Sequence, residues 1–172
     1  MASLMEELIQ VLDQEEVKYK ALLELSVKKT PIIIEGDIKK LQEITDEEQV
    51  AVDEISHLDR KRQEVMNDIA TVMNKDVETL KLSYLIEMME KRPKERDALS
   101  RIHDRLKATV GELVTVNNQN RELIRQSLDM IEFNLSLEKA LRTAPETGEY
   151  TKSASIAGNV LGSAHSGFDA KQ

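Results

Sequence analysis

Apolar side chains recur every three to four residues over most of the chain, and this spacing predicts long amphipathic helices. A first helix is predicted over about residues 3–29. An S-x-x-E capping box, formed by Ser3 and Glu6, precedes its apolar run, and Thr30-Pro31 is expected to disrupt it. The run consists of Leu4, Leu8, Val11, Leu12, Tyr19, Leu22, Leu23 and Leu25.

A second helix is predicted over about residues 37–73, because Gly36 offers a C′ glycine and Asp37 an N-cap. Its apolar positions follow alternating steps of three and four, which is the heptad spacing of a helix lying nearly antiparallel along another helix. Glu48 and Arg62 occupy two slots of this seam, and the others are Leu41, Ile44, Ala51, Ile55, Leu58, Val65, Ile69 and Val72.

Asn74-Lys75-Asp76 interrupts the second helix, and a short amphipathic piece follows it. This piece ends near Lys91-Arg92, and its apolar residues are Leu80, Leu82, Leu85, Ile86, Met88 and Met89.

The last helix is predicted over residues 93–142, with Pro93 in its first turn. Its stripe averages 3.6 residues per step and comprises Leu99, Ile102, Leu106, Val110, Leu113, Asn117, Asn120, Ile124, Leu128, Ile131 and Leu135. At about 1.5 Å per residue this helix would be about 75 Å long, against about 55 Å for the second helix. Part of its apolar face therefore needs cover from the short helix, a second copy or another protein.

Composition changes after Arg142: residues 143–172 hold four of the six glycines and few apolar side chains. Such a segment cannot bury enough surface to offset its ordering entropy, so we expect a flexible tail. Ile156, Val160 and Leu161 would share one helical face, which would allow the tail to fold against a partner.

These patterns predict an all-α fold, an antiparallel bundle of three long helices plus one short helix over residues 1–142, followed by the tail 143–172. Zero cysteines exclude a disulfide scaffold and a thiol nucleophile. A net charge of −8 disfavours binding to nucleic acid or anionic lipid. No apolar run is long enough for membrane insertion and the chain starts without a secretion signal, so a cytoplasmic protein is expected.

Candidate chemistry is sparse. The sequence contains no nucleotide-binding glycine loop and no G-x-S-x-G, so neither an enzyme nor a cofactor is expected. Glu54 and His57 have the E-x-x-H spacing of di-iron bundles, but a second E-x-x-H is missing and His57 falls outside the seam. This spacing is therefore interpreted as a solvated face, and no metal ligand is predicted.

Polar residues that interrupt the apolar seams are more informative: Glu15, Glu48, Arg62, Asn117 and Asn120. A buried polar group costs about 1–3 kcal/mol unless it is paired. Each should therefore find a partner that fixes the register of the helices or, as the less favoured reading, contact a ligand.

Several segments together resemble the FlgN family of flagellar export chaperones over about residues 4–141. The most specific is N-x-x-N-x-x-L-I-x-x-S-L, complete from Asn117 to Leu128. The supporting segments are Leu22-Leu23-Glu24-Leu25, Gly36-Asp37 followed by Leu41, Glu48-Gln49 and Arg62, together with a Tyr in the tail.

The resemblance implies a non-enzymatic cytoplasmic chaperone that holds hook–filament junction proteins and delivers them to the flagellar type III export gate. The expected partner contact lies at the end of the last helix and in the tail. The predicted partner-binding residues are Asn117, Asn120, Ile124, Leu128, Ile131 and Leu135 of the helix, with Tyr150, Ile156, Val160, Leu161 and Phe168 of the tail. Two alternatives stay open: a coiled-coil adaptor or homodimeric scaffold without an export client, and a metal-binding bundle.

Overall fold

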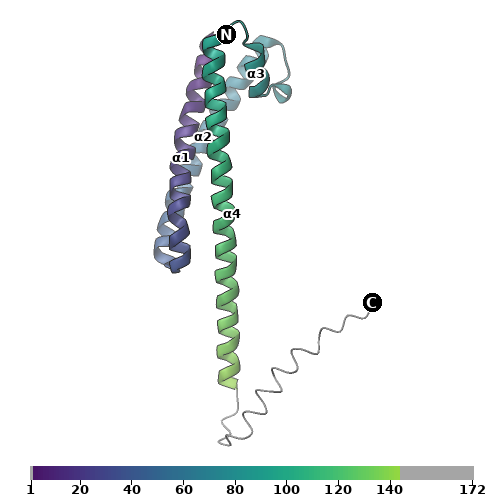
Figure 1. The fold of residues 1–172 in the computed structure, drawn as a ribbon. Helices are drawn as coiled ribbons and strands as arrows, with labels where there is room; N and C mark the ends of the chain where they lie inside the picture. Colours follow the sequence, from purple (N-terminus) through teal and green to yellow (C-terminus); the bar gives the residue numbers. More distant parts are fainter. Residues whose placement is uncertain (1, 144–172) are drawn as a thin grey trace, which may run out of the picture. The chain divides into compact units, whose positions relative to one another are not determined.

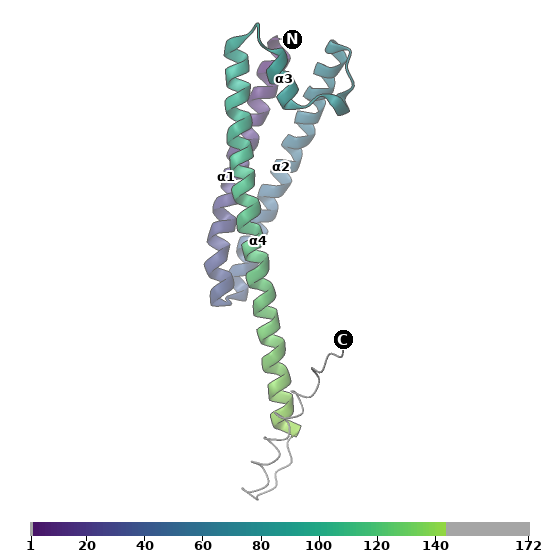
Figure 2. The same cartoon turned by 45° about the vertical axis from the view of Figure 1, so that its right-hand side comes forward.

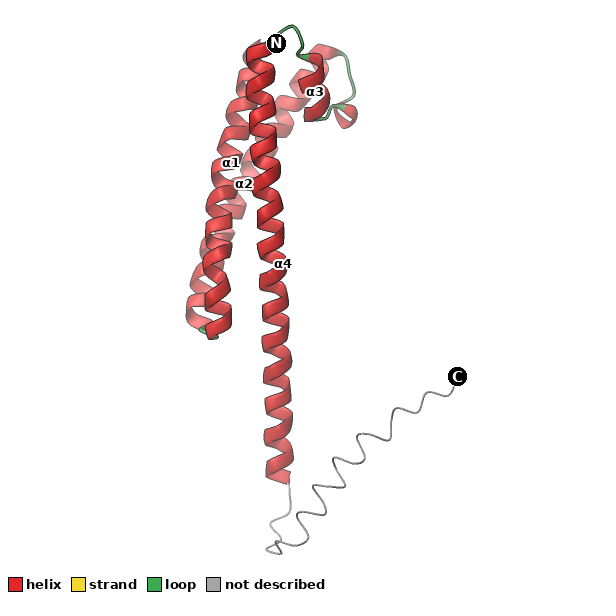
Figure 3. Ribbon diagram, viewed as in Figure 1, coloured by secondary structure: helices red, strands yellow, loops and turns green. Residues whose placement is uncertain are grey.

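A computed structural model of the chain describes residues 2–143 and contains only helices over that range (Figures 1 and 3). The elements are α1 (Ala2–Glu35), α2 (Ile38–Met73), the 3-10 helix η1 (Val77–Thr79), α3 (Leu82–Met88) and α4 (Pro93–Thr143). The chain divides into two compact units, Met1–Asp129 and Met130–Gln172. No helix within residues 2–143 is both long and apolar enough to span a membrane.

In the first unit, α1, α2 and the first part of α4 lie side by side in an up-down-up arrangement (Figures 1 and 2). Ion pairs from Lys18 to Glu54 and from Lys29 to Glu48 show that α1 and α2 are antiparallel. A contact from Arg105 to Asp13 shows that the start of α4 lies beside the start of α1. The predicted all-α helical bundle is therefore confirmed.

The main core lies where α4 begins. Figure 2 shows that the end of α2 diverges from α1 and α4, and that α3 fills the space between them. Leu85 of α3 packs there with Leu12, Ile69 and Leu99, which are fully buried in the same apolar cluster. The short helix therefore covers the first turns of α4 and not its later ones.

The seam predicted along α2 is present. Ile44, Ala51, Ile55, Val65 and Ile69 are buried, and the polar members Glu48 and Arg62 are half-buried. Val72 is the exception, because its side chain is 56% exposed. It lies in the last turn of α2, where that helix has diverged from the other two (Figure 2).

Both predicted turns are present. Gly36 adopts a φ of +72°, and the Asp37 carboxylate accepts a hydrogen bond of 3.0 Å from the backbone N–H of Lys40. This bond lowers the pKa of Asp37 and caps α2. Asn74 ends α2 with a φ of +52°, a left-handed conformation that Asn tolerates better than most residues.

The predicted break at Thr30-Pro31 is wrong, because α1 continues through Pro31 to Glu35. A proline removes one hydrogen bond to the carbonyl four residues earlier, here that of Val27. Ile33 beyond the proline is only 5% exposed, so its burial in the bundle holds the last turn of α1 and offsets the lost bond. Ser3 is also not the N-cap that the sequence predicts, because α1 begins before it, at Ala2.

Candidate functional site

The register between α1 and α4 determines how much of α4 the first unit covers. Asp13 contacts Arg105 and Thr30 contacts Asn120, which are separations of 92 and 90 residues in sequence. These offsets place Glu35, the last residue of α1, beside residues 125–127 of α4. Leu128 follows at once and is 60% exposed.

The second unit begins with residues 130–143, which we call the terminal α4 segment. Every residue of this segment is exposed. Its large apolar side chains are between 49% and 70% exposed, and they are Met130, Ile131, Phe133, Leu135, Leu137 and Leu141. Large exposed apolar side chains gathered this densely mark an interaction surface.

The apolar residues of the terminal α4 segment form two stripes. Met130, Phe133, Leu137 and Leu141 follow steps of three and four and share one face of the helix. Ile131 and Leu135 are one turn apart and share another face. The predicted partner-binding residues do not include the first stripe, although its spacing is visible in the sequence.

The predicted partner-binding residues differ in their exposure. Leu128, Ile131 and Leu135 are exposed, and Ile124 is half-buried. Asn117 is exposed, whereas Asn120 is buried in the first unit. The predictions for the tail fall on residues that lie outside the described range, and they are Tyr150, Ile156, Val160, Leu161 and Phe168.

Asn120 is held by α1 through both ends of its amide. Its Nδ2 donates to the backbone carbonyl of Ser26 at 2.8 Å, and its Oδ1 accepts from the Thr30 hydroxyl at 2.6 Å. The residue is only 4% exposed, so these bonds satisfy a polar group that would otherwise be costly to bury. This arrangement matches the register role expected of polar residues in the seams.

Glu48 of α2 joins the same layer. Its carboxylate accepts from the Ser26 hydroxyl at 3.1 Å and from the Lys29 ammonium at 2.6 Å. All three helices are therefore tied together by polar bonds at one level of the bundle. We call Ser26, Lys29, Thr30, Glu48 and Asn120 the polar layer.

Glu15 and Arg62 form a second buried polar contact. Arg62 Nη1 lies 3.5 Å from Glu15 Oε2, while Glu15 Oε1 has no hydrogen-bond partner among the described residues. The Glu15 side chain is 2% exposed, and this burial raises its pKa against the opposing charge of Arg62. Burial of Tyr19 itself raises the pKa of its phenol, and the nearby charge of Glu15 raises that pKa further.

The metal hypothesis gains no support from the geometry. Glu54 pairs with Lys18 of α1, and His57 is exposed, as its position outside the seam predicts. Within residues 2–143, no group of three His, Asp or Glu side chains lies close enough together to hold a metal ion.

Comparison with known families decides the identity of the chain. The family model described as FlgN protein matches residues 1–157. The chain belongs to the FlgN family. No curated protein and no solved structure gives a significant match.

FlgN membership agrees with the resemblance carried by the segment from Asn117 to Leu128. It gives the chain the general role of a flagellar export chaperone that binds flagellar export substrates. The family is one of chaperones. The exposed stripes of the terminal α4 segment are the kind of surface that this role requires.

Replacing Asn120 by Ala should lower the free energy of unfolding by about 1–3 kcal/mol, because it removes two buried hydrogen bonds from the polar layer. Replacing the exposed Asn117 by Ala is the matched control and should change that energy by less than about 0.5 kcal/mol. Urea unfolding followed by circular dichroism measures both variants. Equal stabilities for the two variants would contradict the register role of Asn120.

The raised pKa of Glu15 predicts a pH-dependent effect on stability. A carboxyl with a raised pKa in the folded state stabilises that state at pH values below its ordinary pKa, and this stabilisation is lost as pH rises through the raised value. We therefore expect Glu15→Gln to raise the free energy of unfolding at neutral pH and to lose this advantage in acid. Glu24→Gln, at an exposed position of the same helix, is the control. Destabilisation by Glu15→Gln at neutral pH would show that pairing with Arg62 outweighs burial.

Proposed function

We propose that this FlgN-family chain binds a helical terminus of hook–filament junction proteins in the cytoplasm, masks it, and delivers the bound protein to the type III export gate. The single observation that carries the proposal is the exposure of six large apolar side chains on the terminal α4 segment. The junction-protein clients and the export gate are inferred from the family resemblance. The contact surface is inferred from the exposure of these six side chains.

Helix addition is the mechanism that suits this surface. The family resemblance implies clients whose helical termini pair with one another in the assembled filament and would self-associate if they stayed exposed. A partner helix with apolar residues at matching steps can lie along a stripe and bury both surfaces. Each Å² of apolar area removed from water contributes about 25 cal/mol, from which the cost of association is subtracted.

Two stripes on one helix suggest two contacts. In our proposal the stripe of Met130, Phe133, Leu137 and Leu141 receives the client helix, because it is longer and contains the largest side chain. The shorter stripe of Ile131 and Leu135 receives residues 144–172 as a strap, through Tyr150, Ile156, Val160, Leu161 and Phe168. Ordering the strap would reduce the affinity gained from this burial.

Charge contributes little to this contact. The terminal α4 segment contains two acidic residues, Glu132 and Glu138, and two basic residues, Lys139 and Arg142. Glu138 and Arg142 already form an ion pair one turn apart. Binding driven by apolar area should therefore depend only weakly on salt.

The test is the affinity of a purified junction protein, measured by calorimetry. We expect Phe133→Ala with Leu137→Ala to weaken binding at least about tenfold, because each truncation removes buried apolar area worth more than about 1 kcal/mol. Helicity should not change, since both side chains are exposed in the free chain. Val114→Ala is the matched control, because Val114 is exposed on α4 within the first unit. Unchanged affinity in the double variant would overturn the proposed surface.

A chain that ends at Thr143 lacks the strap but keeps both stripes of the terminal α4 segment. It should keep nearly all its helicity and its melting temperature but bind the junction protein more weakly. Equal capture by the shortened chain in a pull-down would remove the strap. A constitutive dimer in light scattering, unaffected by the junction protein, would instead favour the homodimeric scaffold.

A further inference from the structure

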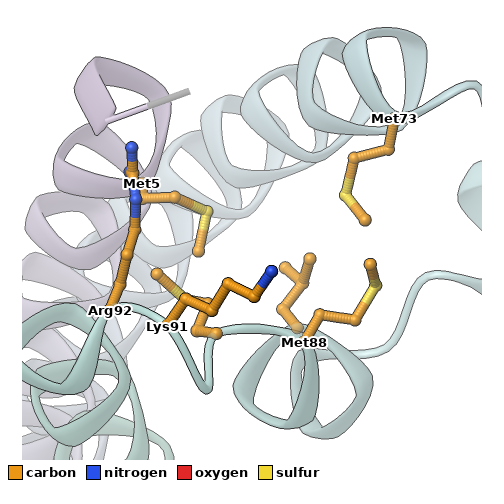
Figure 4. A pocket seen from close by; sticks show the side chains of 7 residues that line it. Met5, Met73, Met88, Lys91 and Arg92 are labelled. Carbon is orange, nitrogen blue, oxygen red and sulfur yellow. The ribbon is translucent and has the colours of Figure 1, made fainter.

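Four methionines surround a cavity at the end of the first unit where α4 begins. Figure 4 shows that Met5 lies on α1, Met73 on α2 and Met88 on α3. The cavity has a volume of about 260 Å³, and its other lining residues are Leu85, Met89, Lys91 and Arg92. We call this site the methionine pocket.

The inner lining of the methionine pocket is buried, and its mouth is open to solvent. Met5, Leu85 and Met89 are at most 8% exposed and belong to the main core. Met88 at the mouth is 50% exposed, and Met73 is half-buried. An unbranched thioether adapts to the shape of its contact and favours aromatic rings, so this lining suits an inserted side chain.

The size of the pocket suits an aromatic group. An apolar cavity of about 150 Å³ is enough to bind a benzene ring. The methionine pocket, at about 260 Å³, has room for such a ring and for neighbouring methylene groups.

The two charged residues that line the pocket are both basic, although the whole chain carries a net charge of −8. Among the described residues, Lys91 and Arg92 are the only charged ones that line the pocket, and both are exposed. In the view of Figure 4 the Lys91 side chain lies between those of Met5 and Met88. Arg92 lies 3.6 Å from Glu95, and no ion pair joins Lys91 to another described residue. A carboxylate beside an inserted apolar group would therefore find a cation within reach.

We propose that the methionine pocket docks an acidic amphipathic helix of a partner protein, with an aromatic side chain inserted in the cavity and carboxylates against Lys91 and Arg92. A helical partner is favoured because residues 2–143 contain no strand edge to which an extended peptide could add. The pocket lies in the first unit, so this docking does not depend on the terminal α4 segment or on the function proposed for it.

The absence of tryptophan and the seven methionines of the chain allow a direct test. The probe is a capped helical peptide of about 15 residues with one Trp and one Leu a turn apart, flanked by Glu. Binding is read from Trp fluorescence and from the methyl NMR signals of methionines labelled in the full chain. We expect shifts at Met5, Met73, Met88 and Met89, with Met66 and Met130 unchanged.

Charge reversal supplies the decisive control. A peptide with Lys in place of each Glu should bind at least about tenfold more weakly, and the K91E/R92E variant should reverse this preference. Both replaced residues are exposed, so helicity measured by circular dichroism should not change. The same variant should bind the junction protein normally, which separates this proposal from the proposed function.

Three results would overturn the proposal. One is the absence of shifts at the pocket methionines with the acidic peptide. Another is equal binding of the acidic and basic peptides. The third is tighter binding of decanoate than of the acidic peptide, which would identify a site for small aliphatic anions.

Discussion

The unequal lengths of the long helices are the constraint on which the rest of the structure depends. α4 has 51 residues, whereas α1 has 34 and α2 has 36. The register between α1 and α4 brings the end of α1 beside residues 125–127, and α3 packs at the start of α4. Apolar side chains placed later in α4 are exposed within the described chain, and a surface of this kind needs a partner. The chaperone role of the FlgN family is consistent with this requirement.

The polar layer fixes the register of the long helices. If the helices slid along one another by a turn, Asn120 would lose its bonds to Ser26 and Thr30, and Glu48 would lose Lys29. Each buried polar group left unpaired would cost about 1–3 kcal/mol, whereas an all-apolar seam would tolerate the shift more easily. The polar residues in the seams therefore serve to specify the register. By fixing the register, they also determine which part of α4 the first unit covers.

Hydrophobic spacing was sufficient to predict most of the fold, because the breakers between helices are few. Gly36, Asp37 and Asn74 end or begin helices where expected. The continuation of α1 through Pro31 could not be predicted, because it depends on Ile33 packing in the bundle and not on local propensity. Thr109 rather than Val110 is buried in α4, since packing against two helices shifts the buried face. In the candidate site, the predicted contact residues Ile131 and Leu135 follow one stripe of α4, and Phe133 lies on the other exposed stripe, which the prediction did not include.

Hydrogen–deuterium exchange of the full chain, with and without a purified junction protein, tests the central claim most directly. That claim is that the terminal α4 segment is uncovered in the free protein and covered in the complex. We expect fast exchange over residues 130–143 in the free chain, a large gain of protection there on binding, and no change around the polar layer. Strong protection of residues 130–143 before binding, or protection that appears only elsewhere after binding, would contradict the account.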